Sequence, residues 1–537
     1  MHRLHLTIII FLFSLICNNL NAQPAEKLSA KDYLAEQDYN HALEEYLKLY
    51  KSKKTDLEIN FQIGFCYLAI NDDKSKALPY LEFVYSKGGY KDELLLYLGI
   101  ANMHSYKFDE AIKFFTDYKA KIKKFEEIDH YILNCESAKI LVKNPVNVTF
   151  ENLGKEINSK FPDYYPFVTQ DQSTLYYTTR REGRSKLKSW QGYYTSDIYF
   201  SKVVAGQWSK PKSIGPMINS PEDEQCVFVT PDGKKMIVYI DNETASGDLF
   251  MTTMKNKAFP RPVSFLEPIN TLDLELEGCI TEDGNMLIIA SDRAAGLGET
   301  DLYMFRKLPV GEWGNPVNLG PNVNTKYKES FPVYDEKNKV LYFASEGHPG
   351  MGGSDIFTSK FDEGTQTFGP AVNMGYPINT PEENLEFTLA ANKRDGYIAA
   401  VRKEGFGDLD IYKVIFNDVE DKPSVVKGII STSDTLKKDI EATISIIDEK
   451  TKVKLDSTNA NPISGKYVLS VYPGKYIMIV TSPGFADFKE ILNVFDKSDY
   501  VFEIEKNIKM LKPGESVAPV LKDAKGAAIK PTNPPKK

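Results

Sequence analysis

The chain has 537 residues, of which 42% are hydrophobic, 12% aromatic and 26% charged. This composition is typical of a folded globular protein and excludes collagen, coiled-coil and polar low-complexity classes. With 66 basic and 74 acidic residues the net charge is −8. That balance argues against a nucleic-acid-binding surface, which requires a clustered excess of Lys and Arg. At roughly 150 residues per domain, the length predicts about three or four domains.

The N-terminal segment is expected to be an export signal. Arg3 precedes an apolar run from Leu6 to Ile16, and the small residue Ala22 lies where signal peptidase would cut. The run is shorter than the roughly 20 residues that span a bilayer. Residues 1–22 are therefore interpreted as a signal peptide rather than a membrane anchor, and we expect an exported, periplasmic protein.

Cysteine positions give two further expectations. Ile16 precedes Cys17, whereas a lipoprotein signal has a small residue there, so we expect cleavage before Gln23 without lipidation. The other cysteines form no CxxC pair and lie in apolar helix or strand patterns, which favours buried free thiols over disulfides. They are Cys66, Cys135, Cys226 and Cys279.

Residues 29–142 contain a repeat of about 34 residues. The small residues Gly64 and Gly99 are 35 apart, and apolar residues around them have the spacing of amphipathic helices. We predict two antiparallel helices per repeat. The pattern resembles the tetratricopeptide repeat family, in which small residues mark sites of close helix approach. That resemblance implies a concave groove for a peptide or partner helix, and packing of the same face on the next domain is the alternative. The repeated alanines are Ala42, Ala77 and Ala111.

Residues 146–416 contain a second repeat, with steps of 51 to 55 residues between equivalent aspartates. Each unit has an Ile-Asn or Val-Asn dipeptide before Ser or Thr, then two strand-like runs joined by a turn, then a Gly-rich loop and an aspartate strand. Four short strands per unit predict a five-bladed β-propeller. The units resemble the periplasmic WD-like repeats of TolB-type proteins. The aspartates are Asp197, Asp248, Asp301, Asp355 and Asp410.

The register of this repeat predicts how the ring is closed. The last aspartate strand, 411–416, lacks a following strand, while residues 146–153 have no unit of their own, so they are expected to complete the last sheet. The repeated aspartates are expected to accept backbone N–H bonds in the loops before their strands. Cation binding by these loops is the alternative.

The C-terminal part consists of two segments of different composition. Residues 423–511 are rich in strand-like runs, and their Gly-Lys-Tyr repeats at Gly465 and Gly474 resemble the carboxypeptidase regulatory-like domain, a small transthyretin-like β-sandwich. That resemblance implies a spacer or contact module. Residues 512–537 carry a net charge of +4 and five prolines, and we predict a disordered basic tail.

No catalytic motif is found in the sequence. GxSxG, GxxxxGK, HExxH and CxxC are absent, and His41, His104, His130 and His348 have no second histidine at ligand spacing. We therefore expect no enzyme, assign no catalytic, cofactor-binding or metal residue, and leave the binding residues unknown. Loop carboxylates leave a propeller hydrolase or lyase open. Glycan or peptide binding is another alternative, supported by an aromatic loop with Trp190, Tyr193 and Tyr194.

The order of the modules, a multidomain α plus all-β fold, resembles the PorE-like periplasmic proteins associated with type IX secretion and gliding in Bacteroidetes. The resemblance implies a non-enzymatic scaffold or assembly factor associated with the outer membrane through envelope proteins, which the helical repeats and the propeller face would bind. Family members typically end in an OmpA-like domain that grips peptidoglycan, but only 26 residues follow Leu511. No direct peptidoglycan anchor, nucleic acid or cofactor is expected.

Overall fold

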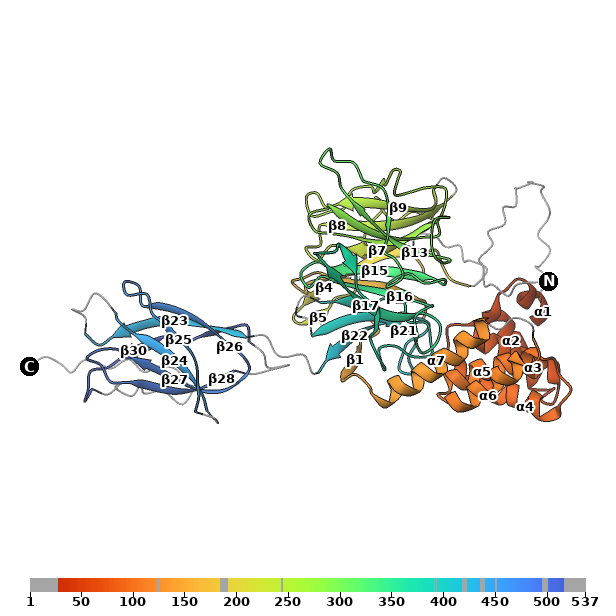
Figure 1. The fold of residues 1–537 in the computed structure, drawn as a ribbon, viewed down its shortest axis with the longest axis horizontal. Coiled ribbons are helices and arrows are strands. Elements are labelled where there is room, and N and C mark those ends of the chain that lie inside the picture. Colours follow the sequence, from red (N-terminus) through yellow and green to blue (C-terminus); the bar gives the residue numbers. More distant parts are fainter. Residues whose placement is uncertain are drawn as a thin grey trace, which may run out of the picture. The chain divides into compact units, whose positions relative to one another are not determined.

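This computed structural model describes residues 28–122, 126–183, 192–242, 245–390, 392, 394–417, 423–434, 440–449, 452–494 and 501–515. The chain divides into two compact units, Met1–Asn417 and Asp418–Lys537. The first contains a helical region and a β-propeller-like region (Figure 1). The predicted signal peptide, 1–22, and residues 516–537 of the predicted tail lie outside the described residues.

Within the described residues, seven α-helices and one short 3₁₀ helix occupy the segment predicted to be helical. Side chains of Ser29, Asp38 and Asp56 accept backbone N–H bonds at the starts of the first three helices, which fixes where these helices begin. The elements are α1 (Ala30–Ala35), α2 (Tyr39–Tyr50), α3 (Leu57–Ala69), η1 (Lys74–Ala77), α4 (Leu78–Lys87), α5 (Glu93–His104), α6 (Phe108–Lys119) and α7 (Glu126–Lys143).

Helices approach each other closely at the repeated glycines. A Cβ atom on Gly64 would lie 2.5 Å from the Leu81 side chain, and one on Gly99 would overlap the Phe115 ring in the same way. No side chain fits at either position without displacing its neighbour, because the interior is close-packed. The spacing of the two glycines thus reflects two equivalent contacts between α3 and α4 and between α5 and α6.

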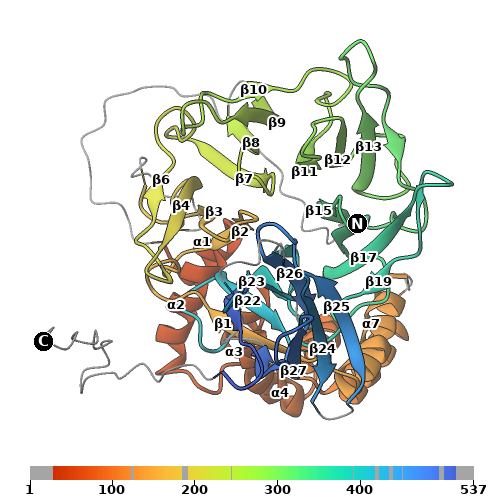
Figure 2. The same cartoon turned by 90° about the vertical axis from the view of Figure 1, so that its left-hand side faces the viewer.

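Strands β1 to β22 form five antiparallel sheets in the described part of residues 148–416. Figure 2 shows the first four sheets following one another around the molecule. The first sheet contains β2 (Asp163–Val168), β3 (Thr174–Thr179), β4 (Asp197–Val204), β5 (Gln207–Trp208) and β6 (Lys212–Ser213). The second contains β7 (Asp223–Val229), β8 (Lys235–Asn242), β9 (Ala245–Thr253) and β10 (Val263–Ser264). The third contains β11 (Glu275–Ile280), β12 (Met286–Ser291), β13 (Asp301–Arg306) and β14 (Val317–Asn318). The fourth contains β15 (Glu329–Asp335), β16 (Val340–Ser345), β17 (Asp355–Asp362), β18 (Thr367–Phe368) and β19 (Val372–Asn373). The fifth contains β20 (Thr388–Leu389), β21 (Asp395–Ala400), β22 (Asp410–Phe416) and β1 (Val148–Asn152).

The fifth sheet joins the two ends of the propeller-like region. β1 pairs antiparallel with β22, in a register from Val148 opposite Phe416 to Asn152 opposite Tyr412. The strand order is β1-β22-β21-β20, so the first strand of the region completes its last sheet. This confirms the predicted role of residues 146–153.

The asparagine side chain of each Ile-Asn or Val-Asn dipeptide makes two backbone hydrogen bonds of the kind that a neighbouring strand would make. Its side-chain oxygen accepts the N–H, and its amide donates to the C=O, of the residue that follows a repeated aspartate, at 2.8 to 3.2 Å. Each amide therefore satisfies two buried backbone groups. The pairs are Asn158 with Ile411, Asn219 with Ile198, Asn270 with Leu249, Asn324 with Leu302 and Asn379 with Ile356.

Three of the repeated aspartates bind the loops before their strands. Asp301 accepts the Gly298 N–H at 3.1 Å, and Asp410 accepts the Phe406 N–H at 2.7 Å. Asp355 accepts the Met351 N–H at 2.6 Å. The structural role predicted for the aspartates is confirmed at these three positions.

The helical region is fixed to the propeller-like region by polar contacts from η1, α5 and α7. Glu382 accepts hydrogen bonds from Lys74 at 3.0 Å and from the His104 ring at 2.9 Å. Burial opposes ionisation of Glu382, but His104 and Lys74 outweigh it and lower the pKa of the carboxyl to about 2. In α7, Asn134 donates to the Gly352 carbonyl at 2.8 Å. The two regions therefore act as one body.

The cysteines and the helices give two further findings. Cys66, Cys135, Cys226 and Cys279 are buried free thiols, as expected. None of the helices in the described ranges is long and apolar enough to cross a membrane.

In the parts of the second unit that the structure describes, two four-stranded sheets surround one hydrophobic core. Val426 and Tyr467 enter this core from one sheet and Ile444 and Met478 from the other. One sheet contains β23 (Ser424–Thr432), β26 (Lys466–Val471), β29 (Glu503–Glu505) and β30 (Ile508–Met510). The other contains β24 (Thr443–Asp448), β25 (Lys454–Asn459), β27 (Gly474–Thr481) and β28 (Phe488–Val494).

Candidate functional site

The first strand of each of the first four sheets begins at a buried acidic residue or next to one. Each carboxylate accepts the backbone N–H of the Ser or Thr four residues earlier, at 2.6 to 2.9 Å. This bond holds the start of the strand in place, so the residue two positions later has a defined orientation. The acids are Asp163, Glu224, Glu275 and Glu329, and the fifth sheet has Asn384 at this position.

The residues two positions later form an equivalent set that includes two carboxyl groups. Tyr165 and Phe331 have φ angles of 53° and 52°, and both lie where the strand register is broken by a β-bulge. Side chains other than glycine rarely adopt this conformation, and bulges reorient side chains at the rims of sheets. The set is Tyr165, Cys226, Glu277, Phe331 and Glu386.

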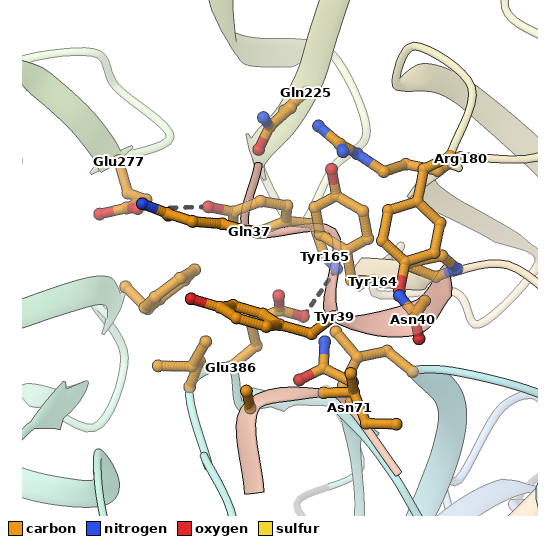
Figure 3. Close-up of a pocket in the computed structure, with 17 residues that line it drawn as sticks. Gln37, Tyr39, Asn40, Asn71, Tyr164, Tyr165, Arg180, Gln225, Glu277 and Glu386 are labelled. Atoms are coloured by element: carbon orange, nitrogen blue, oxygen red, sulfur yellow. Dashed lines mark hydrogen bonds between the residues drawn. The ribbon is translucent and has the colours of Figure 1, made fainter. Parts of the chain in front are cut away.

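A cavity of about 470 Å³ is lined by four members of this set, all except Cys226. Its walls come from both regions of the first unit (Figure 3). The turn after α1 and the start of α2 contribute Gln37 and Tyr39, and the turn after α3 contributes Asn71. The propeller-like region contributes both buried glutamates. The helical region is therefore part of the site, which the sequence did not predict.

Tyr165 contacts both carboxyl groups. Its hydroxyl donates to Glu277 Oε1 at 3.3 Å, and its backbone N–H donates to Glu386 Oε2 at 2.6 Å (Figure 3). Glu277 and Glu386 are 8% and 7% exposed. Glu277 Oε2 is buried and has no hydrogen-bond partner among the described residues.

Burial makes ionisation of both carboxyl groups unfavourable. It raises the pKa of Glu277 to about 7, although Phe331 and Tyr165 offset part of the effect. It raises the pKa of Glu386 to about 8, and the charge of Glu277 adds to the shift. Near neutral pH the pair therefore holds protons that ordinary glutamates would have lost.

Arg180 is a cation in the cavity wall, and it already has an anionic partner. Its guanidinium lies 3.3 Å from Asp223 Oδ1 and 6.0 Å from the centre of the Tyr193 ring. Tyr193 also donates to Asp408 and accepts from Asn40. Of the aromatic loop singled out in the sequence, Tyr193 lines the cavity, Tyr194 does not, and Trp190 lies outside the described residues.

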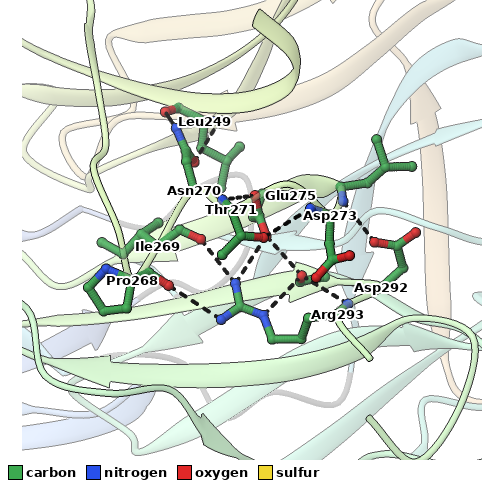
Figure 4. A network of polar contacts seen from close by, with 11 residues as sticks. Leu249, Pro268, Ile269, Asn270, Thr271, Asp273, Glu275, Asp292 and Arg293 are labelled. Carbon is green, nitrogen blue, oxygen red and sulfur yellow. Dashed lines mark hydrogen bonds and ion pairs between the residues drawn. The ribbon is translucent and has the colours of Figure 1, made fainter. Parts of the chain in front are cut away.

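In a second polar network, near the start of the third sheet, the charged side chains bond one another and nearby backbone groups (Figure 4). Arg293 donates to Glu275 Oε1 at 3.1 Å and to the Ile269 carbonyl at 3.0 Å. Arg181 pairs with Asp163 at 2.7 Å in the first sheet in the same way. The carboxylates of Glu275 and Asp163 are therefore taken up by ion pairs within the protein, whereas one carboxylate oxygen of Glu277 has no hydrogen-bond partner among the described residues.

The histidines within the described residues, His41, His104, His130 and His348, each bond a structural partner, such as Asp38 for His41 and the Val323 carbonyl for His348. His104 binds Glu382, and the His130 ring bonds the Glu346 carbonyl at 2.6 Å and stacks on Tyr327. No group of three or more His, Cys, Asp or Glu side chains that could hold a metal ion occurs among the described residues.

We expect Glu386→Gln to flatten the pH dependence of stability. Between about pH 4.5 and 8 the folded state keeps protons that the unfolded state releases, so the free energy of unfolding falls as pH rises. The amide can still accept the Tyr165 N–H but does not titrate. The variant should match the native protein at pH 5 and exceed it by a few kcal/mol at most at pH 9, because each pKa unit is worth about 1.4 kcal/mol. Denaturant titrations at both pH values measure this, with the exposed Glu222→Gln as control. Identical pH profiles for Glu386→Gln and the native protein would contradict it.

Sequence reasoning considered loop carboxylates in general and did not identify this pair. Glu277 lies in β11 and Glu386 in the segment just before β20, at one equivalent position of the repeat, and the other units have Tyr, Cys and Phe there. An alignment of the five units by their Asn dipeptides would have found the pair. The contribution of Gln37 and Tyr39 had no signal in the sequence.

The fold of the first unit is thus a helical region joined to a β-propeller-like region. No family model and no curated protein matches the chain. Among solved structures, TolB from Acinetobacter baumannii is 12% identical, with 54% of this chain and 70% of that chain covered and a TM-score of 0.31. An alpha-L-arabinanase from Penicillium chrysogenum, complexed with arabinobiose, is 11% identical over 50% of this chain and 99% of its own length, with a TM-score of 0.31. An alpha-L-arabinofuranosidase from Lactobacillus brevis is 12% identical over 49% and 91%, with a TM-score of 0.31.

Proposed function

We propose that this protein is a non-enzymatic scaffold or assembly factor of an envelope complex, of the PorE-like type associated with type IX secretion or gliding. In this proposal the helices are tetratricopeptide-type repeats, the five sheets are the blades of a propeller, and the second unit is a transthyretin-like sandwich that acts as a spacer. An export signal would deliver the chain to the periplasm, where partners would hold it at the outer membrane.

The observation that carries the proposal is the fixed junction between the helical and propeller-like regions. Glu382 links Lys74 and His104, and Asn134 links α7 to Gly352. A partner of the helical region and a partner of the propeller-like region would then be held at a constant distance. That geometry serves assembly and is not needed for independent domains.

The uncovered surface also offers a contact for a partner. Leu272, Leu274 and Leu297 are 106%, 41% and 52% exposed in loops of the third sheet. Large apolar side chains exposed in the loops of one sheet are candidates for protein contacts. They are candidates for the propeller-side partner contact.

Comparative crosslinking in the envelope tests the scaffold proposal. Leu272→Ser combined with Leu297→Ser should lose one crosslinked partner, whereas Val310→Ser, an exposed valine in a hairpin turn, should keep it. Removal of residues 23–143 should release a different partner. If the leucine variant and the control retain the same partners, the third-sheet loops are not a contact. If no partner depends on either region, the scaffold proposal fails.

The buried glutamate pair favours a second candidate, a glycan-processing propeller. Acid–base hydrolysis of a glycoside needs one protonated and one ionised carboxyl group, and a pair in one cavity with pKa values of about 7 and about 8 can supply both near neutral pH. Assays with labelled polysaccharides would show activity lost in Glu277→Gln and Glu386→Gln while the protein stays folded. Full function of both variants in the envelope would exclude this candidate.

A further inference from the structure

We propose that the cavity between the helical and propeller-like regions binds a primary ammonium group, with the carboxylates of Glu277 and Glu386 as its hydrogen-bond acceptors and countercharge. The inference goes beyond the scaffold proposal, because it concerns the chemistry of one cavity and can hold whichever envelope partners the chain has. It rests on the charge, the open acceptors and the shape of the cavity.

The described lining residues leave the glutamate pair without a countercharge. Arg180 is the cation of the lining, and its guanidinium is paired with Asp223. Two buried carboxyl groups with no cation nearby are costly when ionised. A guest that brings one positive charge removes that cost, whereas a neutral guest does not.

The pair also presents an unused acceptor. Tyr165 bonds one oxygen of each carboxyl group, and Oε2 of Glu277 makes no hydrogen bond within the described part of the chain. An ammonium group has three donors and no acceptor. It therefore complements one oxygen of each carboxylate and one further acceptor, such as the side-chain oxygen of Gln37 or Gln225 in the same wall.

The shape favours a narrow guest with an apolar stem. Glu277 and Glu386 are only 8% and 7% exposed, so a small ammonium head reaches their oxygens with less displacement of the cavity wall than a sugar ring requires. Tyr39, Tyr165 and Phe331 supply aromatic surface along the cavity. Aromatic faces attract cations and cover methylene stems. A divalent cation fits less well, because it needs six or more oxygen ligands.

Binding should depend on pH in a direction set by the carboxyl groups. The other groups that face them do not titrate with them: Tyr165 and Tyr239 have pKa values raised by burial and stay neutral, and Arg180 stays paired with Asp223. Because an ammonium ion binds the ionised carboxylates, it must displace their protons at low pH. Affinity should therefore rise from pH 6 to pH 8.5, where an alkylamine is still protonated.

A calorimetric titration of the full-length chain with n-butylamine tests the proposal. At pH 8.5 we expect butylamine to bind at least tenfold more tightly than n-butanol, and at least tenfold more tightly than butylamine itself at pH 6. Glu277→Gln and Glu386→Gln should each weaken binding at least tenfold. Glu346→Gln should not, since Glu346 is a partly buried carboxyl group, also with a pKa of about 7, outside the cavity.

Two peptides distinguish the sources of the ammonium group. A blocked tripeptide with a central lysine and an unblocked trialanine amide present a side-chain and an N-terminal amine, and binding of either supports the proposal. Equal binding of butanol and butylamine to the native protein would overturn it, and this comparison needs no variant to fold. Preferential binding of calcium ions or of neutral oligosaccharides, lost in Glu277→Gln, would also overturn it. Loss of partners in the envelope experiment with intact amine binding would reject only the scaffold proposal.

Discussion

A fragment of residues 156–417 should aggregate or melt far below a fragment of residues 140–417. Both lack the helical region, but only the shorter one lacks β1, the strand that pairs with β22 and joins the two ends of the region. Without it, β22 becomes an exposed edge that can pair with another chain. Thermal melting with light scattering measures the difference. Equal stability of the two fragments would show that β1 does not close the ring energetically.

Two substitutions within β1 test whether the packing of this strand, and not only its presence, stabilises the propeller-like region. Phe150 packs with the core of the fifth sheet and beneath the Arg402 guanidinium, whereas the adjacent Thr149 faces solvent. In the full chain, Phe150→Asp should cost about 3 to 5 kcal/mol, because it removes a packed ring and places a charge in its position. Thr149→Asp should cost about 0.5 kcal/mol or less. Similar costs for the two variants would mean that the strand does not pack as described.

The closure of the ring could be predicted because the repeat itself carries the information. Each unit of the sequence has an Asn dipeptide and an aspartate strand, and a unit with a missing strand at one end is complemented by a spare strand at the other. The close contacts at Gly64 and Gly99 were predictable for the same reason, since only small residues recur there. Periodicity reports local packing that is copied from unit to unit.

The candidate site could not be predicted in this way, because it depends on departures from the repeat. Glu277 and Glu386 stand where other units have Tyr, Cys or Phe, and the cavity exists only where α1, α2 and α3 reach the propeller-like region. Docking of the helical region depends on long-range pairs such as Lys74 with Glu382, which are 308 positions apart. No pattern within either segment encodes such a pair.

The repeated asparagines also show the limit of pattern reading. The Ile-Asn and Val-Asn dipeptides were recognised as landmarks of the repeat, but their role required the structure. Each amide pairs with both backbone groups of one residue beside a repeated aspartate, as Asn379 does with Ile356 at 2.8 Å for both bonds. An asparagine that forms a turn and an asparagine that bonds the backbone of a strand cannot be distinguished in the sequence.

Asn379→Leu is therefore expected to destabilise the first unit by about 2 to 6 kcal/mol. Leucine keeps the branched shape but cannot hydrogen-bond, so the N–H and C=O of Ile356 lose their partners in a site where Asn379 is 0% exposed. Each buried backbone group left unpaired costs about 1 to 3 kcal/mol. Asn285→Leu is the control, since that side-chain amide is exposed in a turn and, within the described ranges, bonds only the nearby Asp283 carboxylate. Denaturant unfolding compares the variants, and hydrogen exchange at the Ile356 amide should accelerate in Asn379→Leu alone. An unchanged Ile356 exchange rate would show that the asparagine does not hold this strand.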